Sequence, residues 1–465
     1  MRISVIGCGT VGLVTGVCLA EAGHSVTCTD SDAKRIAGLK AGVVPIYEAH
    51  LDTLLTENQR SGRLSFTSSY KEAVRAGEVI FVCADTLSLE HGETDDSAMD
   101  NVARLMASEE MYARLVVDKN AMDGEAGQQV RRVLEEHSRD GGTRLRVAFN
   151  PEFLREGTAV QDFLHPDRIV VGVEEESSEK QLREVYRPIL ERRFRCPVHG
   201  DKCQAKQPAE FLVTTIKSAE IIKHASNSFL ALKISYANMI ADLCEKVGAD
   251  VKEVTHAMGL DPRIGPHFLD AGVGFGGGCL PKDVQAFIKM GELSGVDFAL
   301  LKEVERINKR RIEVLLEKIR RALWVVKGKR VGILGLAFKA NTDDIRLAPS
   351  LEIIRSLLNE GARVRAYDQE AMDKIAEIYP QIECTREAYD VARGADALVI
   401  LTAWEEFGRL DWERMHGLMT WPLVIDGRNL LERKKMRERG FEYYGLGQSV
   451  EEVEARNTPS PAVQV

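Results

Sequence analysis

The chain has 465 residues, of which 44% are hydrophobic and 29% are charged, and its formal net charge is −9. This length is too great for one ordinary domain, so two or three domains are expected. The acidic balance and the lack of Lys or Arg runs argue against a nucleic-acid surface. No apolar stretch approaches the roughly 20 residues of a membrane span.

Strands and helices alternate along the first part of the chain. A β-branched run at 2–7 enters a glycine turn, and a helix follows to about Ala22. A strand at 24–30 ends on Asp30, and a helix begins at Ser31. Later strands are expected at 78–85, 114–120 and 145–150. Alternation of this kind predicts a parallel sheet with helices on both faces.

A similar pattern returns late in the chain, after a long helical stretch at about 209–247 that ends before Gly248. The runs at 328–339, 362–368 and 395–404 match the first three strands, with a helix at about 350–360 and a further run at 422–427. The predicted fold class is α/β, with two Rossmann-like doubly wound parallel-sheet domains joined by the long central helix. The predicted boundaries are 1–205, a central region at 206–305 that serves as a dimer contact, 306–450, and a disordered tail at 451–465.

Two features bear on cellular location. The first twenty residues have the outline of a secretory signal, but their glycine spacing and direct continuation into a strand favour a strand–turn–helix unit. Nine cysteines are scattered without framework spacing, which indicates free thiols in a reducing cytosol. We therefore expect a cytoplasmic protein.

Cys196, His199 and Cys203 are the nearest approach to a metal-ligand cluster in the sequence. The sequence shows no fourth ligand beside them, so a solvated loop is favoured and no metal is predicted.

The glycine turn at Gly7, Gly9 and Gly12 has the full context of a dinucleotide fingerprint, because it follows a strand, opens a helix and meets an acid at the next strand end. Gly7 permits the tight turn, Gly9 lets the backbone approach a pyrophosphate, and Gly12 allows close packing of helix and strand. The phosphates would lie at the helix N-terminus. Asp30 would accept ribose hydroxyls and repel a 2′-phosphate, which favours NAD over NADP, although Lys34 and Arg35 lie just beyond it. The cofactor contacts expected here are Gly7, Gly9, Thr10, Val11, Gly12, Asp30 and Lys34.

A second glycine-rich segment, GVGFGGGCLPKD at 272–283, presents one thiol. Cys279 stands where a helix should begin, with Pro281 in a position suited to the first turn. A helix N-terminus favours the thiolate that acts as a nucleophile. Asp283 lies four residues on, and therefore on the same helical face. Burial as a small hydrophobic residue is the alternative for this cysteine.

A cysteine beside an NAD domain suggests oxidation at the aldehyde level, through a thiohemiacetal and a thioester that water cleaves. Lys223 and Asn227 share a helix face and could stabilise an oxyanion. The segment 150–157 is expected to place Glu152 and Glu156 on one face as candidate bases for water, and an exposed salt-bridged helix is the alternative.

Taken together, the motifs GCGTVG, NPEFLREGTAVQDFLHPDRIVVG, EIIKHASNSFLA, DPRIGPHF, GFGGGCLPKD, GLAFKANTDD and DGRN resemble the UDP-glucose/GDP-mannose dehydrogenase family over nearly the whole chain. The resemblance implies that the first domain binds NAD, that the last binds a nucleotide sugar, and that the sugar 6-hydroxyl is oxidised twice to give a uronic acid and two NADH. The RIGPHF stretch favours UDP-glucose over GDP-mannose. The family resemblance also implies a homodimer or larger homo-oligomer.

The same resemblance implies roles for individual residues. The catalytic set is Cys279 as nucleophile, Lys223 and Asn227 at the oxyanion, Glu156 in thioester hydrolysis and Asp283 as a water-orienting acid. Further cofactor contacts are Thr86, Glu156 and Lys282. The implied substrate contacts are Glu152, Phe153, Leu154, Arg155, Lys223, Asn227, Arg263, Phe275, Gly276, Lys339 and Arg428, with Arg263 reaching the substrate of a partner subunit.

Three positions depart from the family pattern. The turn after the third predicted strand reads Asp85-Thr86-Leu87, Ala121 replaces a threonine that helps to position water, and Gly278 replaces a serine. A lost hydroxyl costs about 1–3 kcal/mol when its partner stays unpaired. The alternatives are therefore a dehydrogenase of another nucleotide sugar, such as GDP-mannose or a UDP-N-acetyl-hexosamine, or a catalytically impaired nucleotide-sugar-binding protein.

Overall fold

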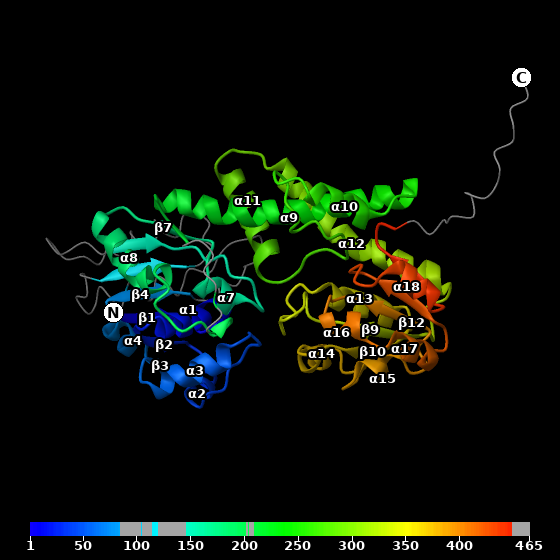
Figure 1. Ribbon diagram of the computed structural model, residues 1–465, viewed down its shortest axis with the longest axis horizontal. Coiled ribbons are helices and arrows are strands. Elements are labelled where there is room, and N and C mark those ends of the chain that lie inside the picture. Colours follow the sequence, from blue (N-terminus) through cyan, green and yellow to red (C-terminus); the bar gives the residue numbers. More distant parts are fainter. Residues whose placement is uncertain (84–103, 105–113, 120–145, 201–202, 204–208, 449–465) are drawn as a thin grey trace, which may run out of the picture. The chain divides into compact units, whose positions relative to one another are not determined.

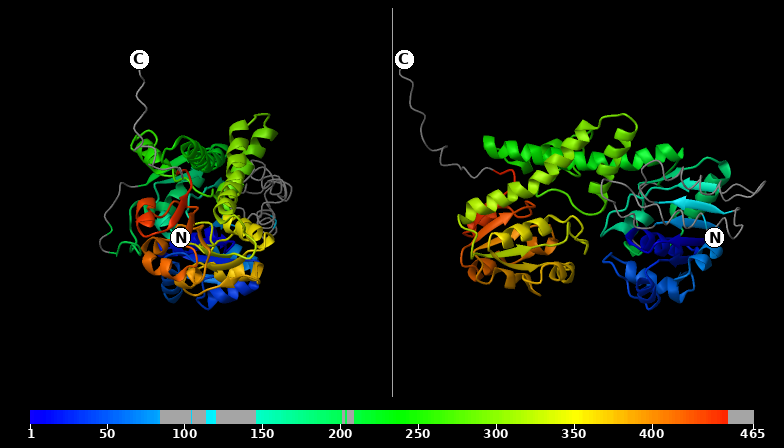
Figure 2. Two further views of the ribbon diagram at one scale, coloured as in Figure 1. Left: turned by 90° about the vertical axis from the view of Figure 1, so that its right-hand side faces the viewer. Right: turned by 180° about the vertical axis from the view of Figure 1, so that it is seen from behind.

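The computed structural model describes residues 1–83, 104, 114–119, 146–200, 203 and 209–448. The chain forms two compact units. Unit 1 contains residues 1–227 and 282–297, and unit 2 contains residues 228–281 and the chain from Phe298 onward. The helices α9 (Ile216–Val247) and α11 (Cys279–Leu293) contribute residues to both units. Figures 1 and 2 draw α9 as one unbroken helix.

Unit 1 is built on an eight-stranded sheet with the order β3-β2-β1-β4-β5-β6-β7-β8. Its strands are β1 (Arg2–Ile6), β2 (Ser25–Thr29), β3 (Leu64–Thr67), β4 (Val79–Val82), β5 (Leu115–Asp118), β6 (Arg146–Phe149), β7 (Arg168–Gly172) and β8 (Glu210–Thr214). The first six strands have the doubly wound order expected for a dinucleotide-binding fold. The parallel sheet is confirmed except between β6 and β7, which pair antiparallel.

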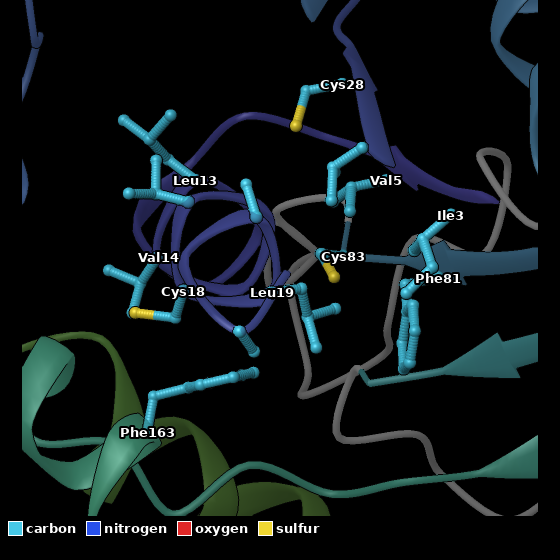
Figure 3. Close-up of a cluster of buried hydrophobic side chains, with 14 of the residues drawn as sticks. Ile3, Val5, Leu13, Val14, Cys18, Leu19, Cys28, Phe81, Cys83 and Phe163 are labelled. Atoms are coloured by element: carbon cyan, nitrogen blue, oxygen red, sulfur yellow. The ribbon is translucent and has the colours of Figure 1, made fainter. Parts of the chain in front are cut away.

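The helices of unit 1 include α1 (Thr10–Glu21), α2 (Ala33–Lys40), α3 (Leu51–Arg60), α4 (Tyr70–Ala76), α7 (Ala159–Leu164) and α8 (Glu176–Leu190). Helix α1 is buried continuously from Gly12 to Ala20. Figure 3 shows its side chains directed both towards strand residues such as Val5 and towards Phe163 of α7. A helix that is covered on all sides needs apolar residues around its whole circumference, which the sequence at 10–21 supplies.

Unit 2 holds a six-stranded parallel sheet with the order β11-β10-β9-β12-β13-β14. Its strands are β9 (Arg330–Leu334), β10 (Arg363–Tyr367), β11 (Glu383–Cys384), β12 (Ala397–Ile400), β13 (Leu423–Asp426) and β14 (Glu442–Gly445). Its helices are α10 (Val251–Gly259), α12 (Ala299–Leu323), α13 (Pro349–Asn359), α14 (Met372–Ile378), α15 (Ala388–Ala392), α16 (Glu405–Arg409), α17 (Trp412–Leu418) and α18 (Arg433–Glu438). Among the described residues of both units, no helix has the length and apolar character needed to cross a membrane.

The internal repeat predicted from the sequence is confirmed by the two sheet orders, because β9, β10 and β12 pair with one another as β1, β2 and β4 do. The strand-end acids also correspond, with Asp30 after β2 and Asp368 after β10. Asp368 is fully buried and accepts hydrogen bonds from five donors, which are the backbone N–H groups of Leu336, Ala337, Glu370 and Ala371 and the indole Nε1 of Trp404.

Three sequence-based expectations about local structure are wrong. The segment 209–215 is not helical but contains β8, and α9 begins only at Ile216. Residues 150–158 form an irregular segment before α7, so Glu152 and Glu156 do not share a helix face. Cys196, His199 and Cys203 do have a possible fourth metal ligand, because His165 lies against them.

Candidate active site

The glycine turn after β1 has the geometry expected for binding a pyrophosphate. Gly7 has φ +93° and donates its N–H to the Thr29 carbonyl oxygen at 2.8 Å. A Cβ at Gly12 would collide with the Gly7 carbonyl oxygen, so α1 packs on the turn only with glycine there. Gly9 is the N-cap of α1 and has no side chain to cap the first helical amides. These amides, including those of Thr10 and Val11, are therefore suited to an anion.

Asp30 is buried at the end of β2, and its carboxylate organises the turn. It accepts the backbone N–H of Cys8 at 2.7 Å and that of Asp32 at 2.9 Å. Arg35 forms an ion pair with it at 3.1 Å. Lys34 is exposed, and its backbone N–H bonds to the Asp32 carboxylate that caps α2. The cation beside the predicted ribose acceptor is thus Arg35, not Lys34.

The residues of unit 1 fit NAD on this evidence. The turn adopts this conformation because Gly7 has a positive φ and Gly12 has no side chain to meet the Gly7 carbonyl, and the Asp30 carboxylate stands where a ribose is bound in such folds. The chemistry of these groups matches a dinucleotide without a 2′-phosphate.

A polar group that the sequence did not single out lies at the carboxyl ends of β5 and β6. Lys119 is buried and donates to the Asn150 side-chain oxygen at 2.9 Å. Tyr186 of α8 also donates to this oxygen, and Asn150 in turn donates to the Val170 carbonyl at 2.8 Å. Burial lowers the pKa of Lys119 to about 8, and nearby Cys83 and Glu152 oppose this shift. The sequence signal that could have identified Lys119 is its position directly after the buried strand β5.

Lys223 of α9 binds Glu152 at two points. Its ammonium donates to the backbone carbonyl of Glu152 at 2.7 Å and to its carboxylate at 2.8 Å. Both side chains are more than nine-tenths buried. Burial by itself raises the pKa of Glu152, but the Lys223 ammonium and the Leu154 N–H outweigh it and hold the pKa below its usual range. The Glu152 carboxylate is therefore charged in the folded protein near neutral pH.

Asp283 of α11 joins this cluster. Asn227, one turn after Lys223 on α9, donates its side-chain amide to the Asp283 carboxylate. Lys223 lies 3.9 Å from the same carboxylate, and His224 lies 3.8 Å from its other oxygen. The structure thus brings together four predicted site residues, Glu152, Lys223, Asn227 and Asp283, all within unit 1.

The remaining predicted residues of the 150–157 segment lie around this cluster. Phe153 has the Lys223 ammonium 5.6 Å from its ring centroid and the Arg168 guanidinium at 3.9 Å. Leu154 packs against the core of unit 1, and Arg155 forms an exposed ion pair with Asp162 at 2.6 Å. Glu156 is half-buried.

In unit 2, the glycine segment at 272–278 is closely packed against other backbone. A Cβ at Gly276 would collide with the Leu347 carbonyl oxygen, and one at Gly272 would lie 2.9 Å from the Gly427 carbonyl oxygen. Gly274 and Gly277 have φ +94° and +79°. The Phe275 backbone N–H donates to the Asn308 side-chain oxygen, and the Asn308 side-chain amide donates to the Phe275 carbonyl, both at 2.9 Å. The glycines are therefore required by packing and backbone conformation, and they fix the segment that leads to Cys279.

Cys279 is the first residue of α11, as predicted, and it is exposed. Lys282 follows in the first turn and is half-buried, and Asp283 comes one helical turn after Cys279. Gly278 packs against Arg346, and a Cβ there would lie 3.1 Å from the guanidinium carbon.

Three predicted cationic contacts occupy different environments in unit 2. Lys339, after β9, lies 5.7 Å from the ring centroid of Phe338. The Arg428 guanidinium donates to three backbone carbonyls, those of Leu401, Gly274 and Phe338, at 2.7–2.9 Å. Burial lowers the pKa of Arg428 to about 10. Arg263 is exposed and pairs with Asp261 at 2.6 Å.

Some predicted positions lie outside the described residues. These are the departures Asp85, Leu87 and Ala121, the cofactor contact Thr86 and the tail at 451–465.

Comparison with known proteins finds three domains of one family along the chain. Residues 1–190 match the NAD binding domain of the UDP-glucose/GDP-mannose dehydrogenase family, residues 217–310 match its central domain, and residues 332–433 match its UDP binding domain.

Similar proteins have been described in bacteria and archaea. The UDP-glucose 6-dehydrogenase of Rhizobium meliloti is 40% identical over 451 residues, covering 96% of this chain and 99% of that protein. The enzyme of the same name from Pseudomonas aeruginosa is 40% identical over 458 residues, covering 96% and 97%. A UDP-glucose dehydrogenase structure from Pyrobaculum islandicum superposes with a TM-score of 0.85 at 36% identity, covering 97% of this chain and 98% of that one. Matches to all three domains, and relatives of this identity along nearly the whole length, confirm the resemblance seen in the sequence: the chain belongs to the UDP-glucose/GDP-mannose dehydrogenase family.

Proposed function

We propose that the chain oxidises UDP-glucose to UDP-glucuronate with NAD, through a covalent intermediate on Cys279. The observation that carries this proposal is the position of Cys279 one helical turn before Asp283, whose carboxylate binds Asn227 and lies 3.9 Å from Lys223. The names of the relatives in Rhizobium meliloti and Pseudomonas aeruginosa support UDP-glucose as the substrate.

Bound NAD would supply the hydride acceptor for each of the two oxidation steps. The chain would hold it with the turn amides of residues 7–12 on the pyrophosphate and with the Asp30 carboxylate on the adenosine ribose. Arg35 already neutralises part of the Asp30 charge.

The sulfur of Cys279 would act after the first oxidation, when C6 of the sugar is an aldehyde. The thiolate forms a C–S bond to C6, and the carbonyl oxygen takes up a proton to give a thiohemiacetal. Loss of a hydride from C6 and a proton from its hydroxyl then leaves a thioester. Water attacks the carbonyl carbon, the C–S bond breaks, and the thiolate is regenerated with release of the carboxylate.

The neighbouring polar groups have matching roles in the proposal. The Lys223 ammonium and the Asn227 amide stabilise negative charge on the C6 oxygen, and Asp283 orients the attacking water. Glu156 accepts a proton from this water as a general base. In unit 2, Lys339 binds the substrate diphosphate. Arg428 ties the glycine segment, through the Gly274 carbonyl, to the carbonyls of Leu401 and Phe338.

We also propose a homodimer in the reducing cytosol. Exposed apolar residues recur along one face of α9, at Phe229, Tyr236, Met239, Leu243 and Val247, and this pattern supports a helix-mediated contact between copies. All nine cysteines are free thiols, which supports the location.

The first test is a stoichiometric assay of the purified protein with limiting UDP-glucose and excess NAD, followed by absorbance of NADH. The expected result is two NADH and one UDP-glucuronate for each UDP-glucose. A folded protein that binds UDP-glucose but releases no NADH would favour the catalytically impaired binding protein. Asp85 and Ala121, which depart from the family pattern, are the residues that suggest this alternative. Turnover of GDP-mannose or a UDP-N-acetyl-hexosamine in preference to UDP-glucose would favour the other substrate class.

The second test addresses the sulfur. Cys279→Ser should abolish UDP-glucuronate formation, by at least about 1,000-fold, because serine lacks an activated thiolate. Binding of UDP-glucose, measured by calorimetry, should stay within about threefold, since the substitution changes one atom. Cys384→Ser, which removes a half-buried thiol from β11, is the matched control. Wild-type acid production by the Cys279 variant would contradict the proposed role.

A further inference from the structure

Unit 1 contains a cluster of four potential metal-binding side chains, and it shares no residue with the proposed reaction. His165 directly follows α7, and Cys196, His199 and Cys203 come from the connection between α8 and β8. One ligand atom from each of the four lies within 4.8 Å of all the others. The four residues come from two chain segments that are 31 positions apart at their nearest ligands.

The distances within this cluster match the edges of a coordination tetrahedron. The His165 Nε2 lies 3.1 Å from the Cys196 sulfur and 3.8 Å from the Cys203 sulfur. The His199 Nδ1 lies 3.4 Å from the first sulfur and 3.8 Å from the second. Tetrahedral Zn²⁺, with bonds of about 2.3 Å to sulfur and about 2.0–2.1 Å to nitrogen, separates these two ligand types by about 3.6 Å. The observed values scatter around this length.

The backbone beside Cys196 also helps to position this ligand. The backbone N–H of His199 donates to the Cys196 sulfur at 3.2 Å. The N–H of Gly200 bonds to the Cys196 carbonyl at 3.1 Å and that of Cys203 to the Gly200 carbonyl at 3.2 Å. These two turns bring the last ligand back towards the first.

The surroundings restrict one ligand and leave an entry path. The His165 ring packs against Phe194 at 5.6 Å between centroids, and its backbone N–H bonds to the Gln161 carbonyl at 2.8 Å. Cys196 is buried, whereas His199 is exposed. Two sulfurs and two imidazoles are donors that select zinc over magnesium or calcium.

We propose that His165, Cys196, His199 and Cys203 bind one Zn²⁺ ion in a closed, structural site. Four protein ligands leave no open position for water or substrate, so the ion has no part in the oxidation. It ties the end of α7 to the connection between α8 and β8. This proposal does not depend on the substrate or on Cys279.

The test uses the full chain, purified with and without added Zn²⁺ and analysed for metal content. We expect one zinc per chain, and, after exchange for Co²⁺, the visible absorption of a tetrahedral site with thiolate-to-metal charge transfer. His199→Gln and Cys203→Ser, which alter exposed or half-buried positions, should each weaken binding by at least about tenfold. Cys384→Ser, which leaves all four ligands intact, should retain full metal content and the same spectrum.

A second measurement follows stability. Adding a chelator should lower the melting temperature of the wild type and of Cys384→Ser, but not that of Cys203→Ser. Absence of zinc from protein prepared with added zinc would overturn the proposal, as would full metal content in both ligand variants. A disulfide between Cys196 and Cys203, detected by mass spectrometry of metal-free protein purified under thiol-blocking conditions and unchanged by zinc, would also overturn it. None of these outcomes depends on dehydrogenase activity.

Discussion

At the scale of single residues, we expect coenzyme choice to depend on how Asp30 shares its carboxylate. This group binds two backbone amides and the Arg35 guanidinium, so it organises the turn in addition to its proposed contact with ribose. An arginine that is held by a carboxylate is not available to a phosphate. If the carboxylate is removed, the same arginine becomes a phosphate ligand.

Asp30→Ser should therefore shift preference towards NADP. We expect kcat/KM for NAD to fall about 10- to 100-fold, because hydrogen bonds to a charged group contribute about 1.5–3 kcal/mol. The value for NADP should rise as repulsion is lost and Arg35 is released. Asp32→Ser, which keeps a capping side chain on α2, is the control. An unchanged ratio of the two values would count against this role of Asp30.

Lys119 makes the stability of unit 1 depend on pH in the alkaline range. Its pKa is about 8 in the folded protein and about 10.4 in an unfolded chain. Between these values the unfolded state binds more protons, so the free energy of unfolding rises with pH across this interval.

In Lys119→Met this rise should be absent. Urea unfolding of both proteins between pH 7 and pH 10 would measure this. The contribution of Lys119 is the difference between the free energies of unfolding of wild type and variant at each pH. Lys434→Met, at an exposed position of α18, should follow the wild type. Parallel curves for wild type and the Lys119 variant would show that this lysine is not the cause.

At the scale of elements, the glycine segment before α11 has little tolerance for added atoms. Gly276→Ala places a methyl group against the Leu347 carbonyl oxygen, which belongs to backbone and cannot rotate away. We expect the free energy of unfolding to fall by about 1–3 kcal/mol. Gly417→Ala, in α17 with nothing within 4 Å of the new methyl group, should be neutral or stabilising by up to about 1 kcal/mol. Chemical denaturation of the two variants, side by side, measures the difference, and equal effects would contradict the packing explanation.

The sequence predicted those elements whose signal is local. The turn at Gly7–Gly12 and the start of α11 at Cys279 each follow from a short motif, and both are confirmed. The prediction of a helix at 209–215 was wrong. These residues continue an apolar helical pattern in the sequence, but pairing with β7 makes them a strand. The segment 150–158 was wrong because contacts made by Lys223 and Glu48 replace helical hydrogen bonds there.

The candidate site was predictable only in part, for a related reason. Lys223, Asn227 and Asp283 stand out by spacing along helices, whereas Lys119 depends on neighbours from other strands. His165 is 31 residues from Cys196, so no local pattern connects it with the other three ligands. Contacts between distant segments are set by the fold and are not visible in spacing.

At the scale of the whole molecule, the apolar face of α9 should decide whether copies associate. Replacing both Phe229 and Leu243 by Glu puts charges on this face, and we expect the proposed dimer to weaken at least about 100-fold. Ile378→Glu, at an exposed apolar position on α14, is the control. Sedimentation over a range of concentrations would follow the change. A wild type that stays monomeric at micromolar concentration would contradict the dimer.

The repeated sheet has one more consequence, which concerns stoichiometry. Asp368 stands where Asp30 stands in the first sheet, but five internal donors already occupy its carboxylate. The Asp368 carboxylate is thus engaged within its own unit, so we expect each chain to bind its coenzyme at the first sheet alone. A four-electron oxidation then requires an exchange at the half-way point, when spent coenzyme departs and a fresh one arrives. During that interval the half-oxidised sugar needs an anchor, and a bond to sulfur would keep it from escaping.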